Sequence, residues 1–356
     1  MSQNCWIRVL YRERLIAEPE FITPGYGGPD GPKGRCLEDP QRRWIPQDMK
    51  AIIIPEQGRA ELMEIEDAKV QRGHVLIKTL YTGVSNGSER HVLTGGPYCS
   101  GYPAAVGYQT VGRVMDVGQG VFEFKKGDIV FTNDWGHKAM SSPAPDQVIK
   151  LPEDINLVAA ALFGVAGSSM HGLLLAEVKP THSVLVLGLG PIGFTAAQLA
   201  RAMGAQVIGV DIVEDRVELA RNYACDDAFN ALDSQVQKAI EEYGPYDLVV
   251  ETTGLDSVIG QALDHVMSRG KILAMAGRTE MRYSNTKAQE KEVSFLHCSH
   301  FWKYDLYHVM RYNLQRKLHI LPMITHQEPV ENAPEVYQCL LETPQNIMGA
   351  VFEWPE

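Results

Sequence analysis

Cysteine is scarce in this chain of 356 residues, and its positions are scattered. The six cysteines are Cys5, Cys36, Cys99, Cys225, Cys298 and Cys339, and no two lie within thirty residues of each other. The sequence therefore lacks the Cys-x-x-Cys pairs of local zinc and redox sites. The N-terminal residues also lack the apolar stretch of a secretory signal. We expect reduced thiols in a cytoplasmic protein, because disulfides belong to oxidising compartments.

An excess of positive charge and a long apolar run are lacking as well. The formal net charge is −11, so this chain lacks the electrostatic attraction of basic proteins to nucleic acids and anionic membranes. The longest apolar run, around residues 184–200, is interrupted by three glycines and a proline and is not a membrane span. The expected partner is therefore a small-molecule substrate, with neither nucleic acid nor membrane.

The length is sufficient for two domains. Residues 1–48 contain a glycine and proline cluster at 24–32 and are expected to form an irregular extension. This extension is either lightly packed or an arm over the active site or a subunit interface. Short strand-like runs follow at residues 50–54, 60–65, 75–80, 110–116 and 128–132. Because turn residues separate these runs, they predict an antiparallel, barrel-like domain.

The periodicity changes after residue 157, where an apolar segment with helical spacing extends to residue 175. Strands at 184–187, 206–210, 246–250 and 271–276 then alternate with helices at 192–203, 214–223, 233–243 and 256–267. Such alternation indicates βαβ units and a parallel sheet. A last strand is expected at 349–354. The predicted fold class is α/β, with a doubly wound parallel sheet over residues 179–317 inserted into a β-rich domain of residues 49–178 and 318–356.

A glycine-rich turn, Gly188-Leu-Gly190-Pro-Ile-Gly193, directly follows the first strand of this sheet and opens a helix. Gly188 permits a tight turn, Gly190 lets a pyrophosphate approach the backbone, and Gly193 permits close packing of helix on strand. The amides at the helix N-terminus attract phosphate. Because the context is right on both sides, the turn predicts a dinucleotide site.

Asp211 ends the second strand, eighteen residues after Gly193. A carboxylate there accepts both ribose hydroxyls and repels a 2′-phosphate, so NAD(H) is expected rather than NADP(H). Arg216 is expected to stack on the adenine or, against this preference, to meet a 2′-phosphate. The other predicted cofactor contacts are Pro191, Ile192, Ile212, Thr253, Ala276 and Gly277.

Several motifs resemble, in order and spacing, those of the medium-chain dehydrogenase/reductase superfamily. They are Gly83-Val84 leading to Gly87-Ser88-Glu89, Gly107-Tyr-Gln-Thr-Val-Gly-Arg113, Val117-Gly118, Gly127-Asp-Ile-Val130, the glycine turn, Glu251-Thr-Thr-Gly254 and Pro322-Met-Ile-Thr-His326. The resemblance covers residues 50–356 and implies that the β-rich domain is a GroES-like catalytic domain, with the nucleotide in the cleft between the domains. It also implies a homodimer or homotetramer.

Many members of this superfamily hold a catalytic zinc through a Cys, a Gly-His-Glu motif and a third Cys or Glu. Here the first position is Ser85 or Asn86, the motif reads Gly107-Tyr108-Gln109, and the third position falls around Gly164. Zinc prefers thiolate, imidazole or carboxylate ligands, so we expect no metal. The segment 83–90 is similar to the zinc-lacking branch typified by bacteriochlorophyllide dehydrogenase, a likeness of site and not of substrate.

Without zinc, side chains must move the proton and stabilise the developing alkoxide during hydride transfer. The resemblance places Ser88 at a hydroxyl that relays the substrate proton, although capping a helix is its alternative role. It places His91 at a histidine near the nicotinamide ribose. Glu89 is expected to be either an acid/base or the partner of a nearby arginine. Tyr108 is expected to donate to the substrate oxygen or else to fill space.

The candidate substrate contacts are Asn86, Gln109, His137, His171, His300 and Trp302. The two amides suit a polar substrate. His171 lies at the end of an apolar helix and is alternatively a core histidine.

These features predict a zinc-independent, NAD(H)-dependent oxidoreductase that interconverts a secondary alcohol and a ketone. The polar candidates favour a polyhydroxylated substrate such as a sugar or cyclitol. One alternative is an enoyl or quinone reductase, which acts on an activated C=C bond and usually prefers NADPH, so Asp211 argues against it. Another is a nucleotide-binding protein without turnover, such as a redox sensor or structural subunit.

Overall fold

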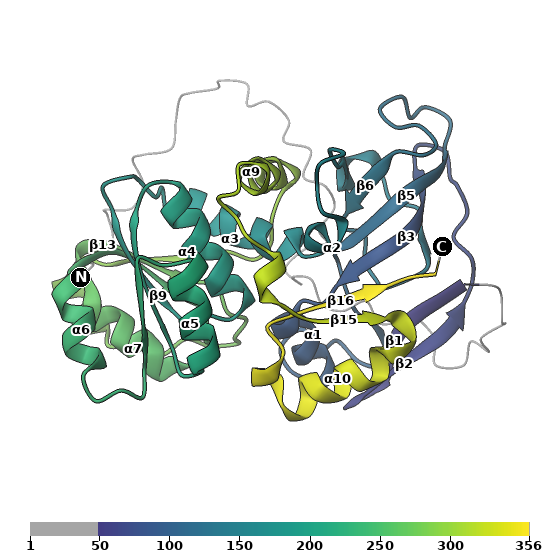
Figure 1. Ribbon diagram of the computed structural model, residues 1–356. Coiled ribbons are helices and arrows are strands. Elements are labelled where there is room, and N and C mark those ends of the chain that lie inside the picture. Colours follow the sequence, from purple (N-terminus) through teal and green to yellow (C-terminus); the bar gives the residue numbers. More distant parts are fainter. Residues whose placement is uncertain (1–48, 356) are drawn as a thin grey trace, which may run out of the picture. The chain divides into compact units, whose positions relative to one another are not determined.

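The computed structural model describes residues 49–355, and the extension expected for residues 1–48 lies outside the described residues. The predicted α/β fold class is confirmed. A parallel sheet with flanking helices is inserted between two parts of a β-rich, GroES-like domain (Figure 1). No helix among residues 49–355 is long and apolar enough to cross a membrane.

The β-rich part contains two sheets. Its strands are β1 (Met49–Glu56), β2 (Arg59–Ile65), β3 (Val75–Gly83), β4 (Ala104–Ala105), β5 (Thr110–Val117), β6 (Ile129–Thr132), β7 (Met140–Ser141), β8 (Val148–Lys150), β15 (Ile324–Pro329) and β16 (Gly349–Glu353). The larger sheet has the order β15-β16-β3-β5-β6-β8, with β7 beside β3, and the smaller one has the order β2-β1-β4. Pairing is antiparallel except between β15 and β16.

Strand β16, near the end of the described chain, lies beside the end of β3, where the motif that begins at Gly83 starts. It pairs antiparallel with β3, and Val351 lies opposite Gly83 in the register. The helical elements of this part are α1 (Asn86–Leu93), η1 (Pro145–Gln147), α2 (Leu157–Ala160), α3 (Phe163–Leu175), η2 (Leu321–Met323), η3 (Val330–Asn332), α10 (Ala333–Glu342) and η4 (Pro344–Asn346). Helix α1, which begins three residues after β3, therefore lies beside residues from the far end of the sequence.

The inserted sheet has six parallel strands in the order β11-β10-β9-β12-β13-β14. The strands are β9 (Ser183–Leu187), β10 (Gln206–Asp211), β11 (Asp227–Asn230), β12 (Tyr246–Glu251), β13 (Val266–Ala274) and β14 (Ser294–His297). The helices are α4 (Pro191–Ala202), α5 (Glu214–Tyr223), α6 (Val236–Tyr243), α7 (Asp256–His265), α8 (Asn285–Glu290) and α9 (Lys303–Leu314). The central strand β9 has β10 on one side and β12 on the other, so the topology switches there. In open α/β sheets, ligands bind at the carboxyl ends of the strands beside such a switch.

Within the inserted domain, the sequence prediction missed β11, β14, α8 and α9. Both missed strands lie at the edges of the sheet, are four residues long and have few buried side chains, so neither carries a clear apolar run. The apolar segment at 157–175 forms two helices because the chain breaks at Ala161 and Leu162. The predicted helix at 256–267 ends earlier, at His265, and β13 begins immediately after it.

Gly83 ends β3 at a point where a second backbone segment approaches closely. A Cβ atom on Gly83 would lie 2.0 Å from the carbonyl oxygen of Ala161. We therefore expect Gly83→Ala to destabilise the protein by about 1–3 kcal/mol, because an overpacked core forces the backbone apart. Urea denaturation measures this difference.

The matched control is Gly87→Ala in the exposed first turn of α1, where an added Cβ meets nothing within 4 Å. It should be neutral or stabilise by up to about 1 kcal/mol, because alanine has the higher helix propensity. Equal losses in both variants would contradict the close approach at Gly83.

Candidate active site

The glycine turn has the geometry that a dinucleotide site requires. Gly188 has φ of 92°, in the left-handed region, and a Cβ there would lie 2.6 Å from the Thr252 hydroxyl. Gly190 is the N-cap of α4 and is open around its Cα, with Arg216 Nη1 the nearest atom at 3.9 Å from an added Cβ. A Cβ on Gly193 would lie 1.8 Å from the Gly188 carbonyl oxygen, so helix and strand meet backbone to backbone. Pro191 and Ile192 form the first turn of α4.

Asp211 is held beside this turn at the carboxyl end of β10. Its Oδ2 accepts a hydrogen bond from the Leu189 amide at 2.6 Å, and its Oδ1 accepts from the Val213 amide at 2.9 Å. Arg216 Nη1 lies 3.9 Å from Oδ2, while Nη2 donates to the Gln345 carbonyl at 3.2 Å. The guanidinium therefore faces Asp211 and a backbone carbonyl of the β-rich domain. Ile212, the next residue after Asp211, is exposed.

The predicted cofactor residues after β12 and β13 surround a second buried carboxylate. Glu251 is fully buried and accepts hydrogen bonds from the amides of Thr253 and Gly254 and from Arg278 Nη2. Ala276 and Gly277 follow β13 at the same end of the sheet. This end carries the glycine turn, Asp211 and the Glu251 loop, so the residues present fit a dinucleotide.

Gly277 is also the place where a residue of the β-rich domain approaches the nucleotide-binding sheet. A Cβ on Gly277 would lie 2.3 Å from the Tyr98 hydroxyl oxygen. The Tyr98 ring lies 5.0 Å from that of His91, measured between centroids. Burial lowers the pKa of His91, and the positive charge of Arg90 lowers it further. His91 is therefore a half-buried, neutral histidine near the part of the sheet expected to bind the nicotinamide.

Three hydroxyl groups meet at the positions that the resemblance assigns to zinc ligands and the proton relay. The Tyr108 hydroxyl lies 2.8 Å from Ser85 Oγ, and Ser88 also lies near this phenol. Burial is the main cause that raises the pKa of Tyr108 to about 12, so the phenol keeps its proton at neutral pH. Ser88 lies inside α1, whereas the N-cap of that helix is Ser85, so the capping alternative for Ser88 is wrong.

Glu89 lies behind these hydroxyls with only 2% of its surface exposed. Its Oε1 accepts from the Ser85 amide at 2.7 Å, and its Oε2 accepts from His137 Nε2 at 3.1 Å and from the Tyr337 hydroxyl. The expected arginine partner is not found, because the Arg90 Nε donates to the Leu340 carbonyl. Glu89 has no exposed oxygen with which to act as an acid or base on a substrate.

Three predicted substrate contacts instead have structural partners. His137 is 1% exposed and bonded to Glu89, so its ring has no exposed edge. Gln109 is equally buried, accepts from the Val165 amide at 2.9 Å and donates to the Gly83 carbonyl at 3.3 Å. Asn86 donates to the Ile347 carbonyl at 2.9 Å. His137 and Gln109 are therefore buried in the structure, whereas the Oδ1 atom of the partly buried Asn86 has no hydrogen-bond partner.

His300 is a predicted substrate contact whose ring packs against Tyr108. Its ring meets the Tyr108 ring edge-on at 5.5 Å, and its Nε2 lies 3.4 Å from Asn133 Nδ2. His171 forms an ion pair or hydrogen bond with Asp305, at 3.1 Å between Nδ1 and Oδ2. Trp302 precedes α9 and is half exposed.

The site does not fit a catalytic zinc ion. Ser85 and Tyr108 bond to each other, and Gln109 uses its amide on backbone groups. A Cβ on Gly164, at the third ligand position, would lie 2.7 Å from the Gln109 side chain. Within residues 49–355, no group of three or more His, Cys, Asp or Glu side chains is placed to hold a metal ion.

The sequence prediction missed several residues of this site. Trp135 stacks against Tyr108 at 6.4 Å, and Tyr337 reaches Glu89 from α10. Burial raises the pKa of Tyr98, and the charge of Arg278 lowers it in part, so both residues belong to the surroundings of this site. Trp135 lies two residues before the candidate His137, and this proximity in sequence was a signal that could have found it. Tyr337 had no signal, because its contact spans 248 positions.

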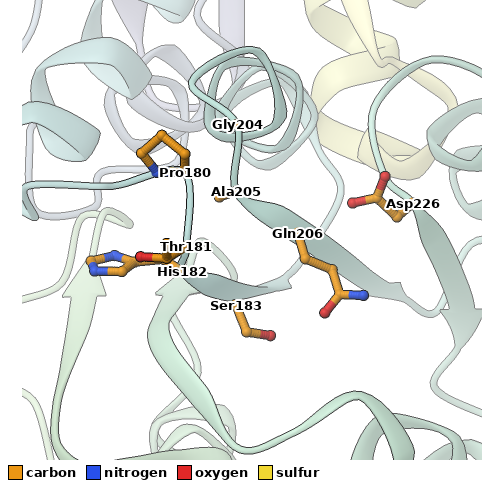
Figure 2. A pocket seen from close by; sticks show the side chains of 8 residues that line it. All are labelled: Pro180, Thr181, His182, Ser183, Gly204, Ala205, Gln206 and Asp226. Carbon is orange, nitrogen blue, oxygen red and sulfur yellow. The ribbon is translucent and has the colours of Figure 1, made fainter.

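A separate polar hollow of about 410 Å³ lies at the opposite, amino-terminal ends of β9 and β10 (Figure 2). Its lining residues are Pro180, Thr181, His182, Ser183, Gly204, Ala205, Gln206 and Asp226. None of the predicted site residues lines it.

Comparison with known proteins places this fold and site in a class. Residues 71–176 match the alcohol dehydrogenase GroES-like domain, and residues 191–312 match the zinc-binding dehydrogenase family. Together the two matches cover more than half of the chain. The chain belongs to the medium-chain dehydrogenase/reductase superfamily of alcohol dehydrogenase-like proteins.

Individual relatives are distant but match over nearly their full length. D-xylulose reductase of Saccharomyces cerevisiae is 26% identical over 351 residues, which cover 86% of this chain and 98% of that protein. An Escherichia coli oxidoreductase of unknown specificity has a TM-score of 0.80 at 21% identity, covering 86% of this chain and 99% of that one. 2R,3R-butanediol dehydrogenase of Bacillus subtilis has a TM-score of 0.77 at 20% identity, covering 87% and 100%.

His300 should stay neutral well below neutral pH. Burial, aided by the nearby His171, lowers its pKa to about 4. Because the ordinary pKa is about 6.5, the unfolded state takes up the proton first as the pH falls. His300 therefore stabilises the folded protein less between about pH 6.5 and pH 4 than at neutral pH. Proton NMR should show its ring titrating near pH 4, and His300→Asn assigns the signal. A midpoint near pH 6.5 would rule out the buried position.

Proposed function

We propose that this protein is a zinc-independent, NAD(H)-dependent oxidoreductase that interconverts a secondary alcohol and a ketone on a polyhydroxylated substrate. The observation that carries the proposal is the contact of the Tyr108 hydroxyl with Ser85 Oγ, near Ser88, at positions where the resemblance implies metal ligands. The same chain carries a dinucleotide-type glycine turn. Relatives with metal ligands at these positions use the metal to stabilise oxygen. Here a protonated phenol is available for that task.

NAD(H) is proposed as the cofactor because of the charge at Asp211. The carboxylate is fixed by two backbone amides beside the glycine turn, where the 2′-oxygen of the adenosine ribose is expected. A 2′-phosphate would meet this negative charge at close range. When bound, NAD(H) supplies or accepts the hydride.

Proton transfer falls to the chain's own side chains. Tyr108 donates a hydrogen bond to the substrate oxygen and so stabilises negative charge that develops there. Ser88, which lies near the same phenol, passes the proton onward, and His91, a neutral histidine three residues further along α1, accepts it.

A polyhydroxylated substrate is proposed because several uncharged polar groups lie near Tyr108, beside the aromatic rings of Trp135 and Phe301. Ser85, Ser88, Asn133 and neutral His300 offer hydrogen bonds without selecting an ion. D-xylulose reductase, whose name states a sugar substrate, is similar over almost its whole length, and this supports the proposal.

The direct test is a substrate panel of sugars, cyclitols and enones, followed at 340 nm with NAD, NADH and NADPH. We expect turnover of polyols with NAD by a preparation whose zinc content is far below one ion per chain. Chelators should leave that turnover unchanged. Stoichiometric zinc with chelator-sensitive turnover would overturn the metal-free proposal, and NADPH-dependent enone reduction would favour the alternative reductase.

Asp211→Asn tests the cofactor preference, since it removes the charge and keeps one oxygen for the Leu189 amide. We expect the ratio of kcat/KM for NAD to that for NADP to fall about 10- to 100-fold. This factor corresponds to the free energy of a hydrogen bond to a charged group. Steady-state kinetics with both cofactors measures the ratio. Glu290→Gln, which removes a charge at an exposed position on α8, serves as the control and should leave the ratio unchanged. An unaltered ratio in Asp211→Asn would remove the argument for NAD.

A further inference from the structure

The Glu89 carboxylate joins three segments of the chain that are remote in sequence. It accepts from the Ser85 amide at the entrance of α1, from His137 in the loop after β6 and from the Tyr337 hydroxyl on α10. All these groups are buried. A buried charge is costly unless it is paired and hydrogen-bonded, so this set of donors fixes the position of the carboxylate.

Ser85 connects this buried set to the hydroxyl cluster. Its amide donates to Glu89, while its own hydroxyl lies 2.8 Å from the Tyr108 hydroxyl. One residue therefore separates Glu89 from the phenol proposed to meet the substrate. The backbone of Ser85 cannot shift without lengthening one of these two contacts.

We propose that Glu89 is a positioning residue: together with His137 and Tyr337, it fixes Ser85 and thereby aims the Tyr108 phenol at the substrate oxygen. The proposal rests on the function proposed above and assigns Glu89 a role other than the acid/base expected from the sequence. Glu89 acts through Ser85 and Tyr108, because its own oxygens face buried donors only.

Electrostatics supports the same role. After burial, the negative charge of Glu89 is one of the effects that raise the pKa of Tyr108. The other titratable groups facing the phenol are Tyr98, which raises its pKa, and the His300 ring at 5.5 Å. The charge of the carboxylate therefore acts in the same direction as burial, which is the main cause of the raised pKa of Tyr108.

The test is a double-mutant cycle of Glu89→Gln and Tyr108→Phe in the full chain. Glutamine keeps the size of the side chain and an oxygen for the Ser85 amide. If Glu89 acts through Tyr108, Glu89→Gln alone lowers kcat about 10- to 100-fold, with KM within about threefold, and has little effect when Tyr108→Phe is already present. Glu290→Gln, at an exposed site on α8, is the matched control and should change neither constant.

Additive losses in the cycle would overturn the positioning role and leave the proposed function standing. Full activity of Tyr108→Phe would instead overturn the proposed role of the phenol. If Glu89→Gln fails to fold, as judged by circular dichroism, Tyr337→Phe removes one donor from Glu89 and keeps the ring that stacks on Phe352. It should lower kcat in the same Tyr108-dependent way, and an unchanged kcat would contradict the proposal.

A second readout does not depend on turnover. With 3,5-difluorotyrosine at position 108, fluorine NMR follows ionisation of the phenol directly. The midpoint should move to lower pH when Glu89→Gln removes the neighbouring negative charge. An unchanged midpoint would show that the carboxylate does not act on the phenol, whatever the substrate proves to be.

Discussion

The site depends on one constraint, which is that a buried carboxylate must be surrounded by donors. Two glutamates obey it, one in each half of the site. Glu89 accepts hydrogen bonds from the Ser85 amide, His137 and Tyr337. Glu251 accepts hydrogen bonds from two amides of its own loop and from Arg278. Removing the charge of Glu89 would leave its buried donors without a partner, which costs more than the bonds contribute when formed. Both glutamates order a segment that directly follows a strand of a sheet.

Packing is also tight at the positions where the resemblance implies metal ligands. Gln109 extends toward α3 and fills the volume beside Gly164, so that a larger residue at 164 would collide with it. The replacements at the ligand positions therefore compensate one another. Gln109, which has a long amide side chain and lies just before β5, packs against Gly164 of α3, which has no side chain. A single substitution back to a metal ligand would not recreate a site, because its neighbours have already taken the room and the hydrogen bonds.

Local sequence patterns predicted much of the fold and pointed to the glycine turn and Asp211 in the candidate site. The glycine turn and Asp211 could be found because they act within one βαβ unit, where spacing along the chain fixes spacing in the structure. The sequence could not reveal that His137 and Gln109 turn inward, since their partners Glu89 and Val165 are 48 and 56 positions away. Nor could it show that Glu89 pairs with Tyr337 on a C-terminal helix. The short edge strands β11 and β14 were missed for a related reason, because they are defined by their neighbours in the sheet and not by an apolar run.

The two ends of the site meet at a single peptide group. The Ile347 carbonyl accepts from Asn86, the first residue of α1, at 2.9 Å and from Arg216 of α5 at 3.5 Å. Arg216 also lies 3.9 Å from Asp211, so the same guanidinium faces the adenosine end of the proposed cofactor site. Arg216 therefore links the carboxylate that ends β10 to the peptide group that also holds the first residue of α1. Polar contacts thus extend from the parallel sheet to the helix that carries Ser88 and His91.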